Sequence, residues 1–143
     1  MVLKSYAKLN LTLNVNKKLK SGLHNIQSIY CLINLYDEIS IKKNRNRLSD
    51  QVSFTGPFSK DIKKSNNSVK KVLNIMRKNK IIHDYYFVKV NKKIPVFAGL
   101  GGGTSNAATL LNYLTNKNLN KKTLSKITKE VGSDLRLFFH NQG

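Results

Sequence analysis

A glycine cluster at residues 99–103 is the part of this sequence whose residue types most clearly suggest a chemistry. Thr104 and Ser105 follow it directly, and a run of small residues typical of a helix start comes next. Because glycine has no side chain, the backbone N–H groups of such a loop can approach an anion closely. The positive end of the following helix adds attraction for negative charge. The cluster therefore predicts a site for a polyphosphate ligand.

Two common phosphate-binding loops do not fit this cluster. A P-loop requires Lys and then Ser or Thr after its last glycine, whereas Gly103 is followed by Thr104. The dinucleotide fingerprint requires a third glycine at position 104 and an acidic residue about 20 positions later, where this chain has lysines and neutral residues. A flexible glycine linker is the structural alternative. Linkers seldom lie between a strand-like segment such as residues 86–90 and an apolar helix such as residues 106–114.

The candidates for proton transfer are a late aspartate and an early lysine. Asp134 follows Gly132 and Ser133 at a predicted helix end and precedes an apolar run. A carboxylate held there with a lysine nearby could accept a proton, although a plain helix-end turn residue is the commoner explanation. Lys8 and Asn10 stand two residues apart on a predicted strand, about 6.6 Å along it. They could therefore contact one small ligand, or simply form a solvated strand face.

These residues need a scaffold of strands and helices, which we read from hydrophobic periodicity. We expect strands at residues 9–15, 26–35, 38–42, 51–54, 85–90 and 135–140, and helices at residues 69–78, 106–114 and 123–131. The first strand should bury Leu9, Leu11, Leu13 and Val15. Tyr36 and Asp37 are assigned to a turn at the surface. Strands gather early and helices flank a later strand, so the fold class is α+β.

Composition limits the class of protein. The 143 residues, 40% of them hydrophobic, suffice for one globular domain. The single cysteine, Cys31, excludes an internal disulfide and fits a reducing compartment. No apolar stretch approaches the roughly 20 residues of a membrane span. We therefore expect a cytoplasmic protein.

The formal net charge of +19 raises the question of nucleic-acid binding. The basic residues are mostly lysines in scattered pairs, and the chain has four arginines and no tryptophan. Specific nucleic-acid readers favour arginine forks and aromatic stacking platforms. We therefore expect no specific nucleic-acid partner, although a positive surface would attract anionic substrates.

Four segments together resemble one known family. They are Ala-Lys-Leu-Asn at residues 7–10, Gly-x-His-x-x-Gln at residues 22–27, the glycine motif at residues 95–108 and Gly-Ser-Asp at residues 132–134. In order and approximate spacing they resemble the family of 4-diphosphocytidyl-2-C-methyl-D-erythritol kinases, within the GHMP kinase superfamily. Phe97 and Ala98 stand where that family commonly has glycine.

The resemblance implies a reaction and its residues. ATP, with Mg²⁺, would phosphorylate the 2-hydroxyl of 4-diphosphocytidyl-2-C-methyl-D-erythritol, a small-molecule substrate of non-mevalonate isoprenoid (terpenoid) biosynthesis. Asp134 matches the catalytic base and Lys8 its partner lysine. Asn10, His24 and Tyr30 match substrate-binding positions, with His24 on the cytosine. The residues matched to ATP binding are Pro95, Val96, Phe97, Ala98, Gly99, Leu100, Gly101, Gly102, Gly103, Thr104 and Ser105; no residue is matched to a metal.

The resemblance also implies a fold and a domain organisation. Residues 1–143 would form the ATP-binding and catalytic N-terminal domain, with the ribosomal-protein-S5-domain-2-like fold, and without the C-terminal domain that the family has. Two other functions stay open. The chain could be an inactive remnant that still binds nucleotides, or a basic RNA-binding module on the same fold.

Overall fold

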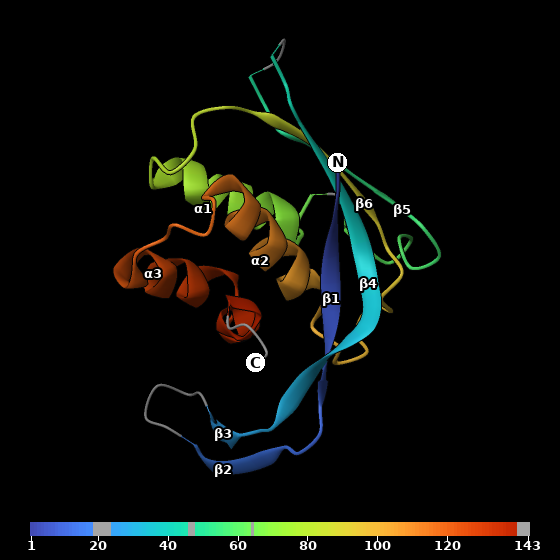
Figure 1. Cartoon of the computed structure of the whole chain (residues 1–143), viewed down its shortest axis with the longest axis vertical. Helices are drawn as coiled ribbons and strands as arrows, with labels where there is room; N and C mark the ends of the chain where they lie inside the picture. Colours follow the sequence, from blue (N-terminus) through green and yellow to red (C-terminus); the bar gives the residue numbers. More distant parts are fainter. Residues whose placement is uncertain (19–23, 46–47, 64, 140–143) are drawn as a thin grey trace.

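In the computed structural model, a four-stranded sheet carries three helices on one of its faces (Figure 1). The structure describes residues 1–18, 24–45, 48–63 and 65–139. The strand order is β1 (Val2–Asn10), β4 (Tyr30–Lys43), β6 (Tyr86–Asn91) and β5 (Gln51–Thr55). Neighbouring strands are antiparallel except for the parallel pair β5 and β6. The helices are α1 (Ser68–Lys78), α2 (Gly102–Leu114) and α3 (Lys121–Val131), followed by the 3₁₀ helix η1 (Ser133–Phe139).

The helices are defined by side-chain caps and by apolar faces. Asn67 caps α1 by accepting a hydrogen bond from the backbone N–H of Lys70, and Asn120 caps α3 in the same way. The apolar face of α1 packs into a single core with α2, α3 and the inner face of the sheet. The largest fully buried side chains in this core include Ile39, Leu73, Met76, Leu110, Leu111, Ile127 and Leu135. None of the described helices is long and apolar enough to cross a membrane.

The observed elements confirm the α+β class. Strands β5 and β6 and helices α1 and α3 occur where periodicity predicts them, within three residues at each end. Helix α2 starts at Gly102, four residues before its predicted start, so the end of the glycine cluster is already helical. The phosphate-binding candidate is thus partly a loop and partly a helix N-terminus.

The predictions for residues 36–37 and for residues 135–140 are wrong. Tyr36 and Asp37 do not form a turn, because β4 runs without interruption from Tyr30 to Lys43 and Asp37 is fully buried. The predicted strand at residues 135–140 is the helix η1 over its described part, residues 135–139. A short apolar run does not by itself distinguish a strand from a buried helical turn.

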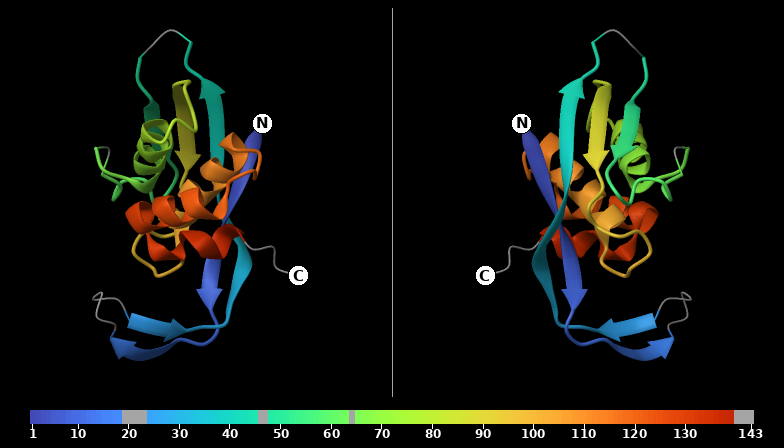
Figure 2. Two further views of the ribbon diagram at one scale, coloured as in Figure 1. Left: turned by 90° about the vertical axis from the view of Figure 1, so that its left-hand side faces the viewer. Right: turned by 90° about the vertical axis from the view of Figure 1, so that its right-hand side faces the viewer.

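A two-stranded arm extends from the body of the molecule (Figure 2). It consists of β2 (Asn14–Lys18) and β3 (His24–Gln27), which pair with each other and not with the main sheet. The predicted strand at residues 9–15 is wrong, because β1 ends at Asn10 and the chain turns before β2. Its expected buried residues are exposed by 42–61%: Leu9, Leu11, Leu13 and Val15. No described helix covers this arm.

Candidate functional site

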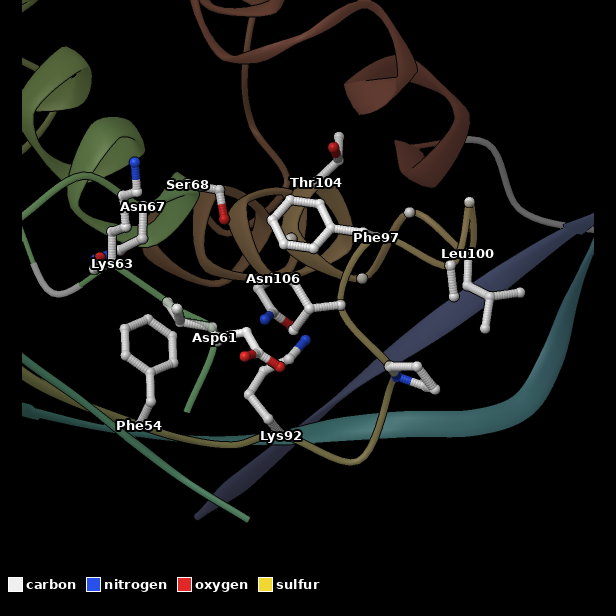
Figure 3. Close-up of a pocket in the computed structure, with 18 of the residues that line it drawn as sticks. Phe54, Asp61, Lys63, Asn67, Ser68, Lys92, Phe97, Leu100, Thr104 and Asn106 are labelled. Atoms are coloured by element: carbon white, nitrogen blue, oxygen red, sulfur yellow. The ribbon is translucent and has the colours of Figure 1, made fainter. Parts of the chain in front are cut away.

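A cavity of about 560 Å³ lies against the glycine loop. Residues 95–104 form one wall, and Asn106 of α2 and Lys92 at the end of β6 extend it. The opposite wall comes from Phe54 and from residues just before α1 (Figure 3). The volume of the cavity is typical of sites that bind small molecules.

The start of α2 presents unpaired backbone donors to this cavity. Gly101 is the N-cap residue, has a positive φ of 66° and provides no side-chain cap. The first helical hydrogen bond runs from the N–H of Ser105 to the carbonyl of Gly101, at 2.8 Å. The N–H groups of residues 102–104 therefore have no carbonyl partner within the helix. Such a helix start favours an anion.

The two hydroxyl residues after the glycines have different surroundings. The Ser105 hydroxyl is buried, where it donates to the carbonyl of Tyr6 at 2.7 Å and accepts from the Ser5 hydroxyl at 2.8 Å. The Thr104 hydroxyl makes no hydrogen bond to the described residues, and Thr104 lines the cavity. Thr104 is therefore the hydroxyl that a ligand can reach.

The structure brings Lys8, Asn10 and Asp134 together next to the glycine loop. The Lys8 ammonium lies 3.4 Å from a carboxylate oxygen of Asp134 and donates to Asn10 Oδ1 at 3.1 Å. The Lys8 side chain is 6% exposed, whereas that of Asp134 is 47% exposed. The backbone N–H of Lys8 also donates to the carbonyl of Leu100, at 3.0 Å. A buried cation beside an accessible carboxylate is an arrangement suited to moving a proton.

The position of Asp134 follows from the end of α3. Helix α3 stops at Gly132, whose φ of 149° is favourable for glycine. Helix η1 then starts at Ser133, and the fully buried Leu135 anchors it to the core. Asp134, the second residue of η1, therefore lies next to Lys8 of β1.

The other two predicted substrate residues differ in what the structure says of them. Tyr30 pairs with Asn10 in the β1–β4 register, and its hydroxyl donates to the carbonyl of Leu137 at 3.0 Å. Tyr30 therefore lies next to Lys8, Asn10 and Asp134, and its hydroxyl is already hydrogen-bonded to the backbone. The backbone of His24 belongs to β3, while its side chain lies outside the described part of the structure.

Sequence reasoning missed several residues around the cavity. Asp37 forms a buried ion pair with Lys92, and residues 45–67, which carry no recognisable motif, supply Asp61 and Asn67 to the cavity. One signal was present. Val88 and Val90 alternate along β6, and Lys92, one residue past its end, continues this alternation. Lys92 is thereby placed on the buried face, where a lysine requires a partner.

Phe97 adopts a backbone conformation that is unusual for its type. Its φ is 63°, and the residue is 93% exposed while lining the cavity (Figure 3). A left-handed φ at a residue with a Cβ is strained. This strain gives a physical reason why glycine would suit position 97 better than phenylalanine does.

Sequence comparison identifies relatives of the chain. Residues 67–140, just over half of it, match the family described as GHMP kinases N terminal domain. A 4-diphosphocytidyl-2-C-methyl-D-erythritol kinase of Pelagibacter ubique is 45% identical, over 94% of this chain and 48% of the relative. One of Finegoldia magna is 36% identical, over 96% of this chain and 50% of the relative. The chain thus spans about half the length of these curated relatives.

Comparison with solved structures gives the same fold. A crystal structure of 4-(cytidine 5'-diphospho)-2C-methyl-D-erythritol kinase aligns with a TM-score of 0.68 and 24% identity, covering 96% of this chain and 48% of that one. Mevalonate pyrophosphate decarboxylase from Streptococcus pyogenes aligns with a TM-score of 0.62 and 18% identity, covering 95% and 44%. The fold, the family match and the relatives confirm the resemblance seen in the sequence, and the chain belongs to the GHMP kinase family.

Proposed function

We propose that residues 1–143 form the ATP-binding and catalytic domain of a kinase that phosphorylates the 2-hydroxyl of 4-diphosphocytidyl-2-C-methyl-D-erythritol. The observation that carries this proposal is the contact between Lys8 and Asp134 beside the unpaired amides of α2. The names of the curated relatives support the choice of substrate.

In this proposal the nucleotide lies along the cavity. The triphosphate occupies the glycine loop, where the N–H groups of residues 102–104 and the Thr104 hydroxyl can donate to it. The base lies toward Phe54 and Ile62, two apolar side chains that line the cavity and do not belong to the glycine loop. Phosphoryl transfer depends mainly on positioning and on neutralising phosphate charge, and donors fixed before the reaction supply both.

Asp134 takes the proton from the substrate hydroxyl. Its half-exposed carboxylate is accessible to a ligand, and the buried Lys8 is close enough to stabilise the negative charge that develops on the attacking oxygen. Asn10 holds Lys8 in place and presents its amide to the substrate. Tyr30 and His24 contact the cytidine part, as the family resemblance implies.

Magnesium fits the donors that face the cavity. Among the described residues, no group of three or more His, Cys, Asp or Glu side chains could hold a metal by themselves. Asp61, Ser68 and Thr104 offer oxygen donors, the kind that Mg²⁺ takes together with substrate phosphates. When bound, Mg²⁺ neutralises phosphate charge.

Phosphate transfer to the cytidylyl substrate tests this function directly. The chain is assayed with ATP, both alone and mixed with a polypeptide corresponding to the other half of its relatives. We expect ATP-dependent phosphorylation, and we expect Asp134→Asn to lower turnover by about 10²–10⁴-fold while leaving ATP affinity nearly unchanged. Unchanged turnover would remove Asp134 from the mechanism.

The two alternative functions predict different results in these assays. ATP binding without transfer in either assay would favour an inactive nucleotide-binding remnant. Steeply salt-dependent RNA binding without ATP affinity would favour the RNA-binding module.

A further inference from the structure

A buried ion pair lies beneath the glycine loop. The Lys92 ammonium, at the end of β6, donates to Asp37 Oδ2 in β4, and both side chains are almost completely buried. Asp37 Oδ1 accepts from the backbone N–H groups of Lys93 and Ile94, at 2.8 and 2.9 Å. One carboxylate thus holds three consecutive residues of the segment that leads into the loop.

The lysine of this pair lies against the start of α2. A Cβ added to Gly102 would be 3.2 Å from Lys92 Nζ, so the ammonium lies close to the first residue of the helix, where only a glycine leaves it room. Lys92 also lines the cavity (Figure 3). A cation at a helix N-terminus is unfavourable by itself, because it adds to the positive end of the helix dipole. Asp37 offsets this charge from the sheet side, and an anion in the cavity would offset it from the other.

Asn106 is an independent sign that the cavity has an unfilled polar contact. Asn106 is 2% exposed and lines the cavity, and its Oδ1 has no hydrogen-bond partner among the described residues. Asn106 lies four residues after Gly102, on the same face of α2. Buried polar atoms without a partner are rare in native proteins, and because Oδ1 only accepts hydrogen bonds, a water bound together with the ligand would provide the missing donor.

We infer that Lys92 is a phosphate-binding residue of this site, fixed in position by Asp37. This inference rests on the proposed function, because it takes the nucleotide triphosphate to be the anion that occupies the loop. The structural alternative is that Lys92 only neutralises Asp37. The two roles differ in whether the lysine charge affects ligands that carry phosphates.

The neighbouring Lys93 provides a matched control. Its ammonium donates to Glu38 at 2.6 Å, which raises the pKa of Lys93, and its side chain is 41% exposed. It does not line the cavity. Replacing it removes the same charge from the same segment without altering the proposed site.

The test compares ATP with adenosine, which lacks the phosphates. Lys92→Met alone would leave Asp37 buried and unpaired, so the main variant is the double substitution Asp37→Asn with Lys92→Met, which removes both charges. Affinities are measured on the full chain at one fixed salt concentration. We expect about 10- to 100-fold weaker ATP binding and adenosine binding unchanged within about twofold, the loss typical of a charged hydrogen bond. Lys93→Met should leave both affinities unchanged.

A second measurement keeps the inference testable if the double variant does not fold. Adding tripolyphosphate to the unaltered chain should shift the side-chain ammonium NMR signal of Lys92 and leave that of Lys93 in place. Unchanged ATP affinity in a folded double variant, or an unshifted Lys92 signal on saturation, would overturn the inference and leave the proposed function standing. Failure of the unaltered chain to bind ATP would overturn both.

Discussion

Two glycines of the loop offer a comparison that separates backbone strain from packing. Gly99 and Gly101 both have left-handed φ values, 73° and 66°. A Cβ at Gly99 would have nothing within 4 Å. A Cβ at Gly101 would be 3.1 Å from Phe138 Cζ and 3.2 Å from Lys8 Cγ, closer than ordinary contacts. We therefore expect Gly101→Ala to be the more harmful substitution.

The expected losses follow from these contacts. Placing an alanine in the left-handed region costs about 1–2 kcal/mol, and this cost is common to both variants. Crowding a packed site adds about 1–3 kcal/mol, and this cost applies only to Gly101→Ala. The free energy of unfolding should thus fall by about 1–2 kcal/mol for Gly99→Ala and by about 2–5 kcal/mol for Gly101→Ala.

Urea denaturation of both variants measures this difference, with m-values compared to confirm that the unfolded states are alike. In Gly101→Ala the displaced Lys8 should also weaken its contact with Asp134, so that any kinase activity falls further than in Gly99→Ala. Equal losses of stability would show that the Lys8 and Phe138 side chains move aside freely. That result would refute the view that Gly101 is required for close packing around Lys8.

Three further outcomes follow from other contacts. Asp50→Asn should lower the free energy of unfolding by about 3–5 kcal/mol, because Arg77 would lose its mostly buried, bidentate partner. Urea titration measures this loss, and a loss under about 1 kcal/mol, the value for an exposed ion pair, would contradict the prediction. Ser105→Ala should cost about 1–3 kcal/mol by leaving the Tyr6 carbonyl without its partner, whereas Thr104→Ala should be nearly neutral by thermal denaturation; equal effects would contradict the burial difference. Hydrogen bonds from Lys93 and then Asn91 lower the pKa of Glu38 below 4.5, so its contribution to stability is complete above that pH and is lost as the pH falls through the lowered value. The melting temperature of Glu38→Gln should depend less on pH in this acidic range, and an unchanged dependence would exclude Glu38 as a source.

The sequence predicted those parts of the fold that depend on local pattern. Helix α3 was predictable from its periodicity and from Gly132, and β6 from its alternating valines. The Lys8 and Asp134 contact joins residues far apart in the chain, and only the family resemblance could indicate it. Local spacing contains no information about which distant carboxylate meets which lysine.

The errors have physical causes in the tertiary structure. Asp37 was assigned to a turn between two predicted strands, yet a lysine 55 residues away allows it to be buried in β4. The leucines after Asn10 alternate as in a half-buried strand, but no described element covers them. An apolar pattern predicts burial only where a second layer exists to bury it.

The uncovered arm has a practical consequence for the protein in solution. The exposed Leu11, Leu13 and Ile29, which flank its two strands in the chain, would favour apolar association between molecules, whereas the net charge of +19 opposes it by mutual repulsion. Dissolved salt at 0.1 M screens the repulsion between charges that are more than roughly 10 Å apart, but it leaves the apolar attraction intact. Purified samples should therefore remain monodisperse in dilute buffer and begin to self-associate as ionic strength rises.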